Sequence, residues 1–188
     1  MIIEPTAIPE VKRIIPQRFG DDRGFFAETW HRAKFTDLGI DLDFVQDNHS
    51  LSARVGTLRG LHFQAPPHAQ AKLVRCGRGA IFDVSVDIRR GSPTYGQWVG
   101  AELSADNGHQ MLIPAGFAHG FVTLLPDSEI IYKCSDYYAP EYEGVVQWND
   151  PEIGIAWPLQ GEPVLSEKDA KAPALSDIAS PFTWESAV

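Results

Sequence analysis

Three ionisable side chains stand inside short apolar segments that have the pattern of β-strands. His62 lies within Arg59 to Gln64, Lys72 follows ten residues later, and His119 lies within Ile113 to Phe121. A lysine that points into the interior of a β protein costs free energy unless it meets an anion. We therefore expect these side chains to form a functional site rather than part of the core.

The residue types suit proton transfer at a carbon atom next to a carbonyl group. A histidine such as His62 titrates near neutral pH and can abstract the proton, while the Lys72 cation can offset the charge that develops on the carbonyl oxygen. Tyr132 could return a proton from another side. Taken alone, His62 would more often be structural and Tyr132 a packing aromatic. Together they predict a racemase or an epimerase.

The elements that must position these residues are short strands, because 16 glycines and 14 prolines divide the chain into many short segments. The clearest strand is 80–88, in which Asp83 belongs to a polar face that is either exposed or lines a polar interior. We expect His62 and Lys72 to lie on the two strands of a hairpin. Further strands are predicted at 71–75, 98–103, 109–113, 120–125, 129–135 and 144–148.

Helix is scarce in this pattern. One helix is predicted over 29–38, ending at Gly39, and a second begins at Ser166. The regular spacing of strands favours an all-β fold, a barrel with short flanking helices. We expect residues 1–188 to form a single domain, with N-terminal strands and a C-terminal tail packing on the barrel.

Charge and composition exclude several classes of partner. The net charge of −9 opposes binding to nucleic acid, so a phosphate-bearing ligand should be small and met by a local cluster of cations. Cys76 and Cys134 lack the spacing of a zinc site and are expected to be buried, reduced thiols. The N-terminus lacks a signal-peptide pattern, and no apolar run has the length of a membrane span. We expect a soluble, cytoplasmic protein with no membrane partner.

Two motifs resemble the signature of cupin barrels. Gly108-x5-Pro114-x-Gly116-x2-His119 matches the second half, and Gly56-x5-His62-x-Gln64 follows the first half with glutamine in place of a histidine and no glutamate after it. Of the ligands of an iron cupin, only His62 and His119 remain. His68 could replace the missing histidine, but its Pro-Pro-His context is typical of a loop. No metal is predicted, and a metal-dependent cupin such as an oxygenase stays as an alternative.

The chain as a whole resembles the dTDP-4-dehydrorhamnose 3,5-epimerase family. The resemblance is carried by Asp22 to Glu28, Gln46 to Ser50, Gly56 to Gln64, Gln70 to Val74, Asp87 to Thr94, Ile113 to Phe121, Trp148 to Pro151 and Ser166 to Asp169. It implies a cupin-type jelly-roll barrel and a homodimer. It also implies epimerisation of dTDP-4-dehydro-6-deoxy-alpha-D-glucose at C3 and C5, without metal or nicotinamide, to dTDP-4-dehydro-beta-L-rhamnose in dTDP-L-rhamnose biosynthesis.

The resemblance implies a role for each catalytic residue. His62 matches the base, and Asp169 matches the carboxylate that holds the other ring nitrogen of the base. Lys72 corresponds to the cation that stabilises the enolate, and Tyr132 to the proton donor on the opposite face of the sugar. Asp169 has a second interpretation, because Ser166-x-x-Asp169 is also a capping box, and one carboxylate could serve both purposes.

The remaining matches are contacts with the ligand. Arg23, Arg59 and Lys168 would hold the pyrophosphate, and Tyr138 would stack on the thymine while Tyr137 packs inward. Further contacts are carried over to Glu28, Gln46, Asn48, His119 and Glu143. On a regular strand Arg59 points away from His62, so either a bulge intervenes or Arg59 serves a site built partly by a neighbouring element. His119 is expected to pair with Asp83 within hydrogen-bonding distance.

Two further alternatives have the same residues. A single-site epimerase of another dTDP-4-keto-deoxysugar pathway would differ only in how the sugar ring sits against Tyr132. A non-catalytic barrel that binds sugar nucleotides would need the cations and the stacking aromatic, but not His62, Lys72 and Tyr132 together.

Overall fold

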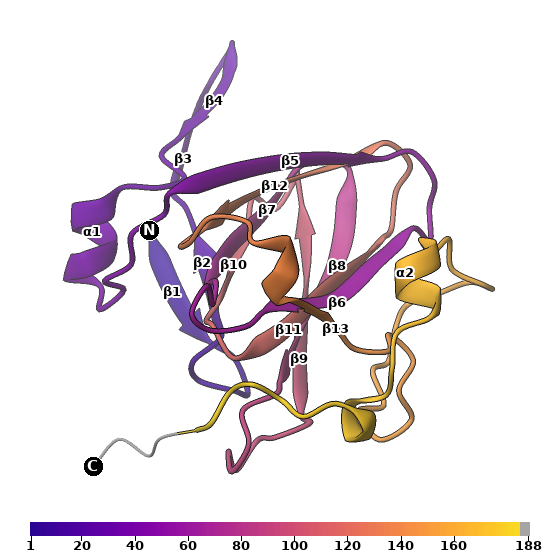
Figure 1. Ribbon diagram of the computed structural model, residues 1–188. Helices are drawn as coiled ribbons and strands as arrows, with labels where there is room; N and C mark the ends of the chain where they lie inside the picture. Colours follow the sequence, from indigo (N-terminus) through magenta and orange to yellow (C-terminus); the bar gives the residue numbers. More distant parts are fainter. Residues whose placement is uncertain (185–188) are drawn as a thin grey trace.

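The computed structural model describes residues 1–184, which form two β-sheets that pack face to face (Figure 1). One sheet has six strands in the order β1-β2-β10-β7-β12-β5, and the other has five in the order β13-β6-β11-β8-β9. Neighbouring strands in both sheets are antiparallel. The all-β, cupin-type jelly-roll barrel with short helices is therefore confirmed. Residues 185–188 of the predicted 1–188 domain lie outside the described part.

The bounds of the elements follow the turn residues between them. The six-stranded sheet contains β1 (Ile2–Pro5), β2 (Lys12–Ile15), β5 (Gln46–Ser52), β7 (Lys72–Arg78), β10 (Gln110–Ile113) and β12 (Ser128–Cys134). The five-stranded sheet contains β6 (Leu58–Gln64), β8 (Ala80–Asp87), β9 (Trp98–Ser104), β11 (Phe117–Thr123) and β13 (Glu143–Val145). Outside them lie the hairpin β3 (Arg18–Asp21) and β4 (Gly24–Ala27), the helices α1 (Arg32–Asp37) and α2 (Glu167–Ala170), and two single 3₁₀ turns (Pro140–Tyr142 and Leu175–Asp177).

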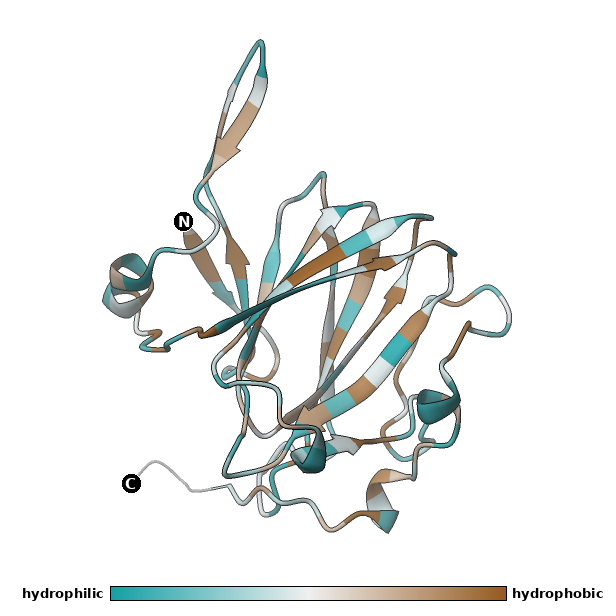
Figure 2. Ribbon diagram, turned by 45° about the horizontal axis from the view of Figure 1, so that its top comes forward, coloured by the Kyte–Doolittle hydropathy of each residue, from teal (hydrophilic) through white to brown (hydrophobic). Residues whose placement is uncertain are grey.

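The main core lies between the two sheets, and the period of two along each strand decides what enters it. Hydrophobic and hydrophilic residues alternate along the long strands (Figure 2). On β8, Ile81 packs against Val74 of the opposite sheet, while Val84 and Val86 belong to a second cluster on the outer face. Asp83 has the same parity as Ile81. The polar face predicted for this strand therefore faces the interior of the barrel.

The hairpin expected for His62 and Lys72 is wrong. β6 pairs with β11 and β13, whereas β7 pairs with β10 and β12, so the two strands belong to different sheets. The segment between them crosses from one sheet to the other, as connections in a jelly roll do. His62 and Lys72 therefore approach each other across the interior of the barrel instead of lying side by side.

The two predicted helices are present but short. The first is α1, which begins three residues later than predicted and stops before Gly39, whose φ of +80° suits a glycine. The second is α2, whose N-cap is Ser166 as predicted. The N-terminal strands were predicted without bounds and are β1 to β4, whereas β5 was not predicted. The predicted strand at 120–125 begins earlier, at Phe117.

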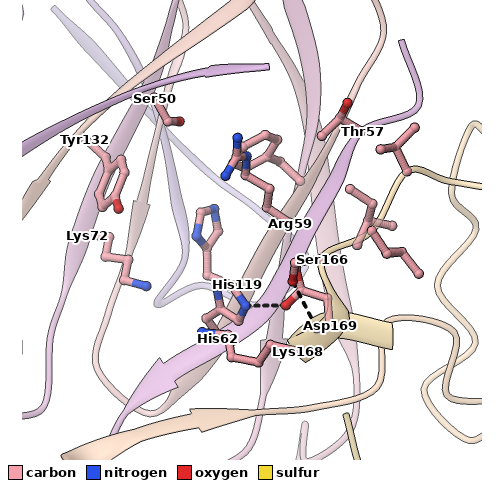
Figure 3. A pocket seen from close by; sticks show the side chains of 14 residues that line it. Ser50, Thr57, Arg59, His62, Lys72, His119, Tyr132, Ser166, Lys168 and Asp169 are labelled. Carbon is pink, nitrogen blue, oxygen red and sulfur yellow. Dashed lines mark hydrogen bonds and ion pairs between the residues drawn. The ribbon is translucent and has the colours of Figure 1, made fainter. Parts of the chain in front are cut away.

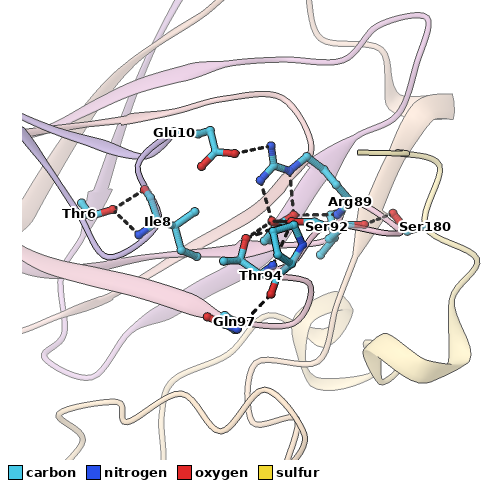
Figure 4. Close-up of polar contacts among 11 residues, drawn as sticks. Thr6, Ile8, Glu10, Arg89, Ser92, Thr94, Gln97 and Ser180 are labelled. Carbon is cyan, nitrogen blue, oxygen red and sulfur yellow. Dashed lines mark hydrogen bonds and ion pairs between the residues drawn. The ribbon is translucent and has the colours of Figure 1, made fainter. Parts of the chain in front are cut away.

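A hydrogen-bond network closes the end of β8 away from the central cavity (Figure 4). The carboxylate of Asp87 accepts hydrogen bonds from Arg89 at 2.7 Å, from Ser92 at 2.6 Å and from Thr94 at 2.6 Å. Arg89 also pairs with Glu10 at 3.0 Å, which ties the N-terminal loop to this end of the barrel. The segment 87–94, which carried part of the family resemblance, is thus a structural tie between loops.

The hairpin of β3 and β4 projects away from both sheets (Figure 1). Its aromatic side chains Phe25 and Phe26 are 61% and 69% exposed. Two such rings on a two-stranded ribbon lack a core of their own to pack against. In residues 1–184, no helix has the length and the apolar character needed to cross a membrane.

Candidate active site

A cavity of about 600 Å³ lies between the two sheets, and a smaller chamber of about 300 Å³ adjoins it. His62, Lys72 and Tyr132 line both spaces, so they stand at the junction. Figure 3 shows Lys72 and Tyr132 on one side of the cavity, with His62 between them and Asp169. Lys72 and Tyr132 come from the six-stranded sheet, and His62 comes from the five-stranded sheet.

His62 and Asp169 form an imidazole–carboxylate pair. The distance from His62 Nε2 to Asp169 Oδ1 is 2.6 Å, and the Asp169 side chain is only 3% exposed. Burial acts to raise the pKa of Asp169, but the hydrogen bond and the charge of His62, together with Ser166 and Lys168, outweigh it, so the pKa is lowered and the carboxylate stays ionised. The backbone amide of Asp169 donates to Ser166 Oγ at 3.1 Å, so this residue takes part in the helix cap as well as in the pair.

A second pair lies beside the first. His119 of β11 is the cross-strand partner of His62, and its Nε2 lies 2.8 Å from Asp83 Oδ2, as predicted. The Asp83 side chain is fully buried. Among residues 1–184, its second oxygen, Oδ1, has no hydrogen-bond partner. Asp83 therefore fixes the orientation of His119, which in turn faces the cavity.

A bulge in β6 explains how Arg59 and His62 reach the same cavity. His62 pairs with His119 and Arg59 with Phe121, so the register shifts between these pairs. Gly60 has a φ of +125°, and a Cβ there would lie 2.6 Å from the Cα of Gly120. Of the two alternatives for Arg59, the bulge is present. Arg59 lines the large cavity while its Nε donates to Ser52 at 3.1 Å.

Lys72 points into the barrel. Val74, on the same face of β7, is fully buried, which excludes a lysine that merely lies along an exposed strand. No described residue forms an ion pair or a hydrogen bond with its ammonium group. Loss of hydration lowers the pKa of Lys72, and the nearby Cys134 and Glu143 oppose this shift. The group is a cation that an anionic ligand would stabilise.

Tyr132 lies beside Lys72 on the six-stranded sheet and faces His62 across the junction of the two spaces. Its ring packs against the main core, and burial raises the pKa of its hydroxyl, so the phenol keeps its proton at neutral pH. A protonated phenol beside a reacting carbon can act as a proton donor.

Four of the nine predicted ligand contacts lie around the smaller chamber. It is lined by Gln46 and Asn48 from the inward-facing positions of β5, and by Tyr138 and Glu143. Lys168, which lines the large cavity, donates to Glu143 at 2.8 Å. The two spaces are thus joined by an ion pair as well as by shared residues.

The predicted orientation of Tyr137 is wrong. This side chain is 64% exposed instead of packed inward, because the loop after β12 leaves the sheet at this point and the backbone carbonyl of Tyr137, not its ring, contacts Gln64. Tyr138 is also largely exposed, at 55%, but it borders the smaller chamber.

Arg23 and Glu28 do not reach either space within this chain. Arg23 lies at the turn of the β3–β4 hairpin, where its side chain is 90% exposed and pairs with Asp21. Glu28 pairs with Lys34 at 2.7 Å. Among the described residues, neither one lines the cavity or the chamber.

Several cavity residues were not predicted from the sequence. The large cavity is also lined by Ser50, Thr57, Leu58, Phe121, Val164 and Leu165, and the small chamber by Phe63, Gln64, Gln70 and Cys134. The period of two in 46–52 could have indicated Ser50, which shares a face with Gln46 and Asn48. Val164 and Leu165 carry no such signal, since they reach the cavity through an isolated bridge between Thr57 and Val164.

The donor set of a metal-dependent cupin is not assembled. In residues 1–184 there is no group of three histidine, cysteine or acidic side chains placed to hold a metal ion. The Nε2 atoms of His62 and His119 each bond to an aspartate. His68, the candidate third ligand, instead lies 3.1 Å from Asp136 in a surface loop.

Sequence comparison agrees with this arrangement. Residues 5–177 match the family model described as dTDP-4-dehydrorhamnose 3,5-epimerase. The chain is 58% identical over 172 residues to the enzyme of that name from Pseudomonas aeruginosa, covering 91% of this chain and 94% of the relative. It is 53% identical over 184 residues to the one from Sinorhizobium fredii, covering 98% and 94%.

Solved structures show the same fold. A crystal structure of dTDP-6-deoxy-D-glucose-3,5-epimerase from Legionella pneumophila in complex with dTDP-4-keto-L-rhamnose superposes with a TM-score of 0.94 at 47% identity, covering 98% of each chain. A 3'-monoepimerase from Streptomyces bikiniensis in complex with dTDP-quinovose gives 0.86 at 37% identity, covering 92% of this chain and 87% of that one. The chain therefore belongs to the dTDP-4-dehydrorhamnose 3,5-epimerase family.

Proposed function

We propose that the protein inverts dTDP-4-dehydro-6-deoxy-alpha-D-glucose at C3 and C5 by proton transfer between opposing sheets. The observation that carries this proposal is the position of His62 on one sheet and Tyr132 on the other, at the same junction. A sugar ring between them would present one face to each residue. Inversion needs this arrangement, because the proton must leave from one face and return to the other.

His62 is the base in this proposal. The C4 ketone acidifies the hydrogens on C3 and C5, so one imidazole can serve both carbons if the ring turns between the two steps. Asp169, ionised and 2.6 Å away, holds the ring nitrogen that does not face the substrate and stabilises the imidazolium that forms.

Lys72 offsets the charge of the enolate. Its ammonium group has lost hydration through burial and lacks an anionic partner among the described residues. The oxyanion that develops on the substrate supplies this partner. An interaction that becomes strong only when charge develops lowers the barrier rather than merely binding the substrate. Tyr132 then delivers a proton to the opposite face.

The nucleotide is held by the surrounding cations and polar residues. Arg59 and Lys168 line the large cavity, and they are positioned for a pyrophosphate. Tyr138, largely exposed beside the smaller chamber, offers an aromatic face to the thymine. The sugar contacts are assigned to His119, Gln46, Asn48 and Glu143.

The functional unit in this proposal is a homodimer. Arg23 projects on a hairpin with the exposed Phe25 and Phe26, and it cannot act at a cavity that it does not line in its own chain. In the dimer, the two rings pack on the second copy, and Arg23 reaches the pyrophosphate of the ligand bound there. Glu28, at the base of the same hairpin, contacts the same ligand. Each protomer acts as one domain, in the cytoplasm, where the buried free thiols Cys76 and Cys134 stay reduced.

Deuterium exchange tests the reaction. Chelator-treated protein is incubated with dTDP-4-dehydro-6-deoxy-glucose in heavy water, and each ring carbon is followed by NMR. We expect deuterium at both C3 and C5 of the inverted product. Label at neither carbon would contradict the proposed class, and full loss of activity on chelation that metal restores would favour the metal-dependent alternative.

The same spectrum distinguishes the double epimerase from a single-site epimerase. This alternative is supported by the likeness to a 3'-monoepimerase. Label and inversion at only one carbon would assign the protein to that group. The discriminating feature would then be the depth at which the ring sits between His62 and Tyr132.

A further inference from the structure

Each inversion leaves the two catalytic groups in the wrong protonation states for the next. When His62 removes a proton from one face and Tyr132 delivers one to the other, the imidazole has gained a proton and the phenol has lost one. Two inversions on one substrate require that both groups be restored in between. A group that can both give and accept a proton, placed between them, would do this without opening the cavity to solvent.

The strand register places Lys72 within reach of Tyr132. In the pairing of β7 with β12, Lys72 lies opposite Cys134 and Tyr132 lies opposite Val74. Lys72 and Tyr132 are therefore diagonal neighbours on the inner face of one sheet, a relation in which long and aromatic side chains can touch. Figure 3 shows the Tyr132 hydroxyl pointing toward Lys72.

Lys72 is also next to His62, because these two and Tyr132 are the residues common to the large cavity and the small chamber. The neighbouring carboxylates are engaged elsewhere: Glu143 bonds to Lys168 and Asp83 to His119. No described residue locks the ammonium of Lys72 in an ion pair. It can therefore turn between the base and the acid.

We propose that Lys72 is the proton relay that resets the site between inversions. Its ammonium passes one proton to the Tyr132 phenolate, which gives a neutral amine and a phenol. The amine then takes the surplus proton from the His62 imidazolium. The sum of the two transfers restores neutral His62, protonated Lys72 and protonated Tyr132, and no other reactant is consumed.

The acid strengths of the two groups favour this direction. Loss of hydration lowers the pKa of Lys72, and burial raises the pKa of Tyr132. Both shifts make the transfer of a proton from the Lys72 ammonium to a Tyr132 phenolate more favourable than it would be in water. The charged groups around Lys72 that set this balance are Glu143, Asp83 and Lys168.

The relay rests on the proposed reaction, and Lys72→Arg separates the two. Arginine keeps the positive charge but does not release a proton near neutral pH. In rapid-quench experiments in heavy water, we expect this variant to complete about one inversion per active site and then to turn over at least ~10-fold more slowly than that burst. If Lys72 only offsets charge, the first inversion and the later ones slow by the same factor, so no burst appears. That result would overturn the relay. Absence of exchange in the wild type would overturn the reaction itself.

A second variant covers the case in which arginine does not fit. With Lys72→Ala, added methylammonium should restore continuous turnover, whereas guanidinium should restore only the first inversion. Equal rescue by both cations would contradict the relay. Lys133→Arg, on the neighbouring strand and paired with Asp47, is the matched control and should keep the wild-type progress curve.

Discussion

Two buried aspartates on β8 show how one strand serves two purposes. Asp87 and Asp83 are both fully buried, and they lie four residues apart on the same inner face. Asp87 accepts five hydrogen bonds, three from Arg89 and one each from Ser92 and Thr94. Asp83 has one, from His119, and its other oxygen has no partner in residues 1–184.

The difference separates a closed end of the barrel from a reactive one. At Asp87 every strong acceptor is satisfied, so this end contributes to stability. At Asp83, and at Lys72 across the barrel, buried polar groups have fewer partners than they can use. Such groups cost stability in the free protein. The Lys72 ammonium, which lines the cavity, can gain a partner when an anionic ligand enters.

The largest expected effect is a loss of kcat when His62, at the reactive end, is replaced. His62→Ala removes the base, so we expect kcat to fall by about 10³-fold, within the range for a general base. The melting temperature should fall less than in a variant of the closed end, because His62 is 27% exposed and its removal lets water reach the Asp169 carboxylate that loses its partner. Activity above a tenth of the wild type would show that the base is elsewhere.

The closed end should respond in the opposite way. Asp87→Asn removes the buried anion of this network and leaves Glu10 as the remaining anionic partner of Arg89, so we expect the free energy of unfolding in urea to fall by about 3 kcal/mol. At temperatures well below the unfolding midpoint, kcat should stay near the wild-type value. A large loss of kcat in folded protein would break the proposed division between the two ends.

Asp83→Asn is the matched variant on the same strand. The hydrogen bond to His119 then lacks an anionic partner, so His119 is held less firmly against the substrate. We expect this interaction with the substrate to weaken by about 1.5–3 kcal/mol, which lowers kcat/KM roughly 10- to 100-fold. The free energy of unfolding should fall by less than in Asp87→Asn, because fewer contacts are lost. The reverse order of stabilities would contradict the comparison.

The smallest expected effect is on acid stability. Burial acts to raise the pKa of Asp87, but hydrogen bonds from Arg89, Ser92 and Thr94 outweigh it, so the folded pKa is lowered. Its contribution is therefore complete above the unfolded pKa of about 3.9 and is lost as the pH falls through the folded pKa. Urea unfolding below about pH 4 should show that the difference between wild type and Asp87→Asn shrinks. A constant difference would contradict this assignment.

The sequence predicted the strands near the site but not how they pair. The alternation in 80–88 placed Asp83 on the correct face because the period of two is a local property. The hairpin of His62 and Lys72 was wrong because alternation does not tell which sheet a strand joins. In this fold, the chain crosses between sheets after β6, and this crossing is what brings His62 and Tyr132 to opposite sides.

Features that depend on close backbone contact could be predicted only as alternatives. For Arg59 a bulge was one of two, and the structure has it at Gly60, where a side chain would clash with Gly120. The Asp169 carboxylate could be assigned to the helix cap or to His62, and in the structure it bonds to His62 while the backbone amide of Asp169 takes part in the cap. Arg23 was grouped with the other cations although it lies at the turn of a projecting hairpin.

The central claim is that the base and the acid act from opposing sheets on opposite faces of one ring. Tyr132→Phe tests it most directly, because this variant removes the acid and leaves His62 in place. In heavy water, NMR should show deuterium entering at the carbon next to the ketone while the sugar keeps its original configuration, since the proton can only return from the His62 side. Inversion by Tyr132→Phe at the wild-type rate would contradict the account.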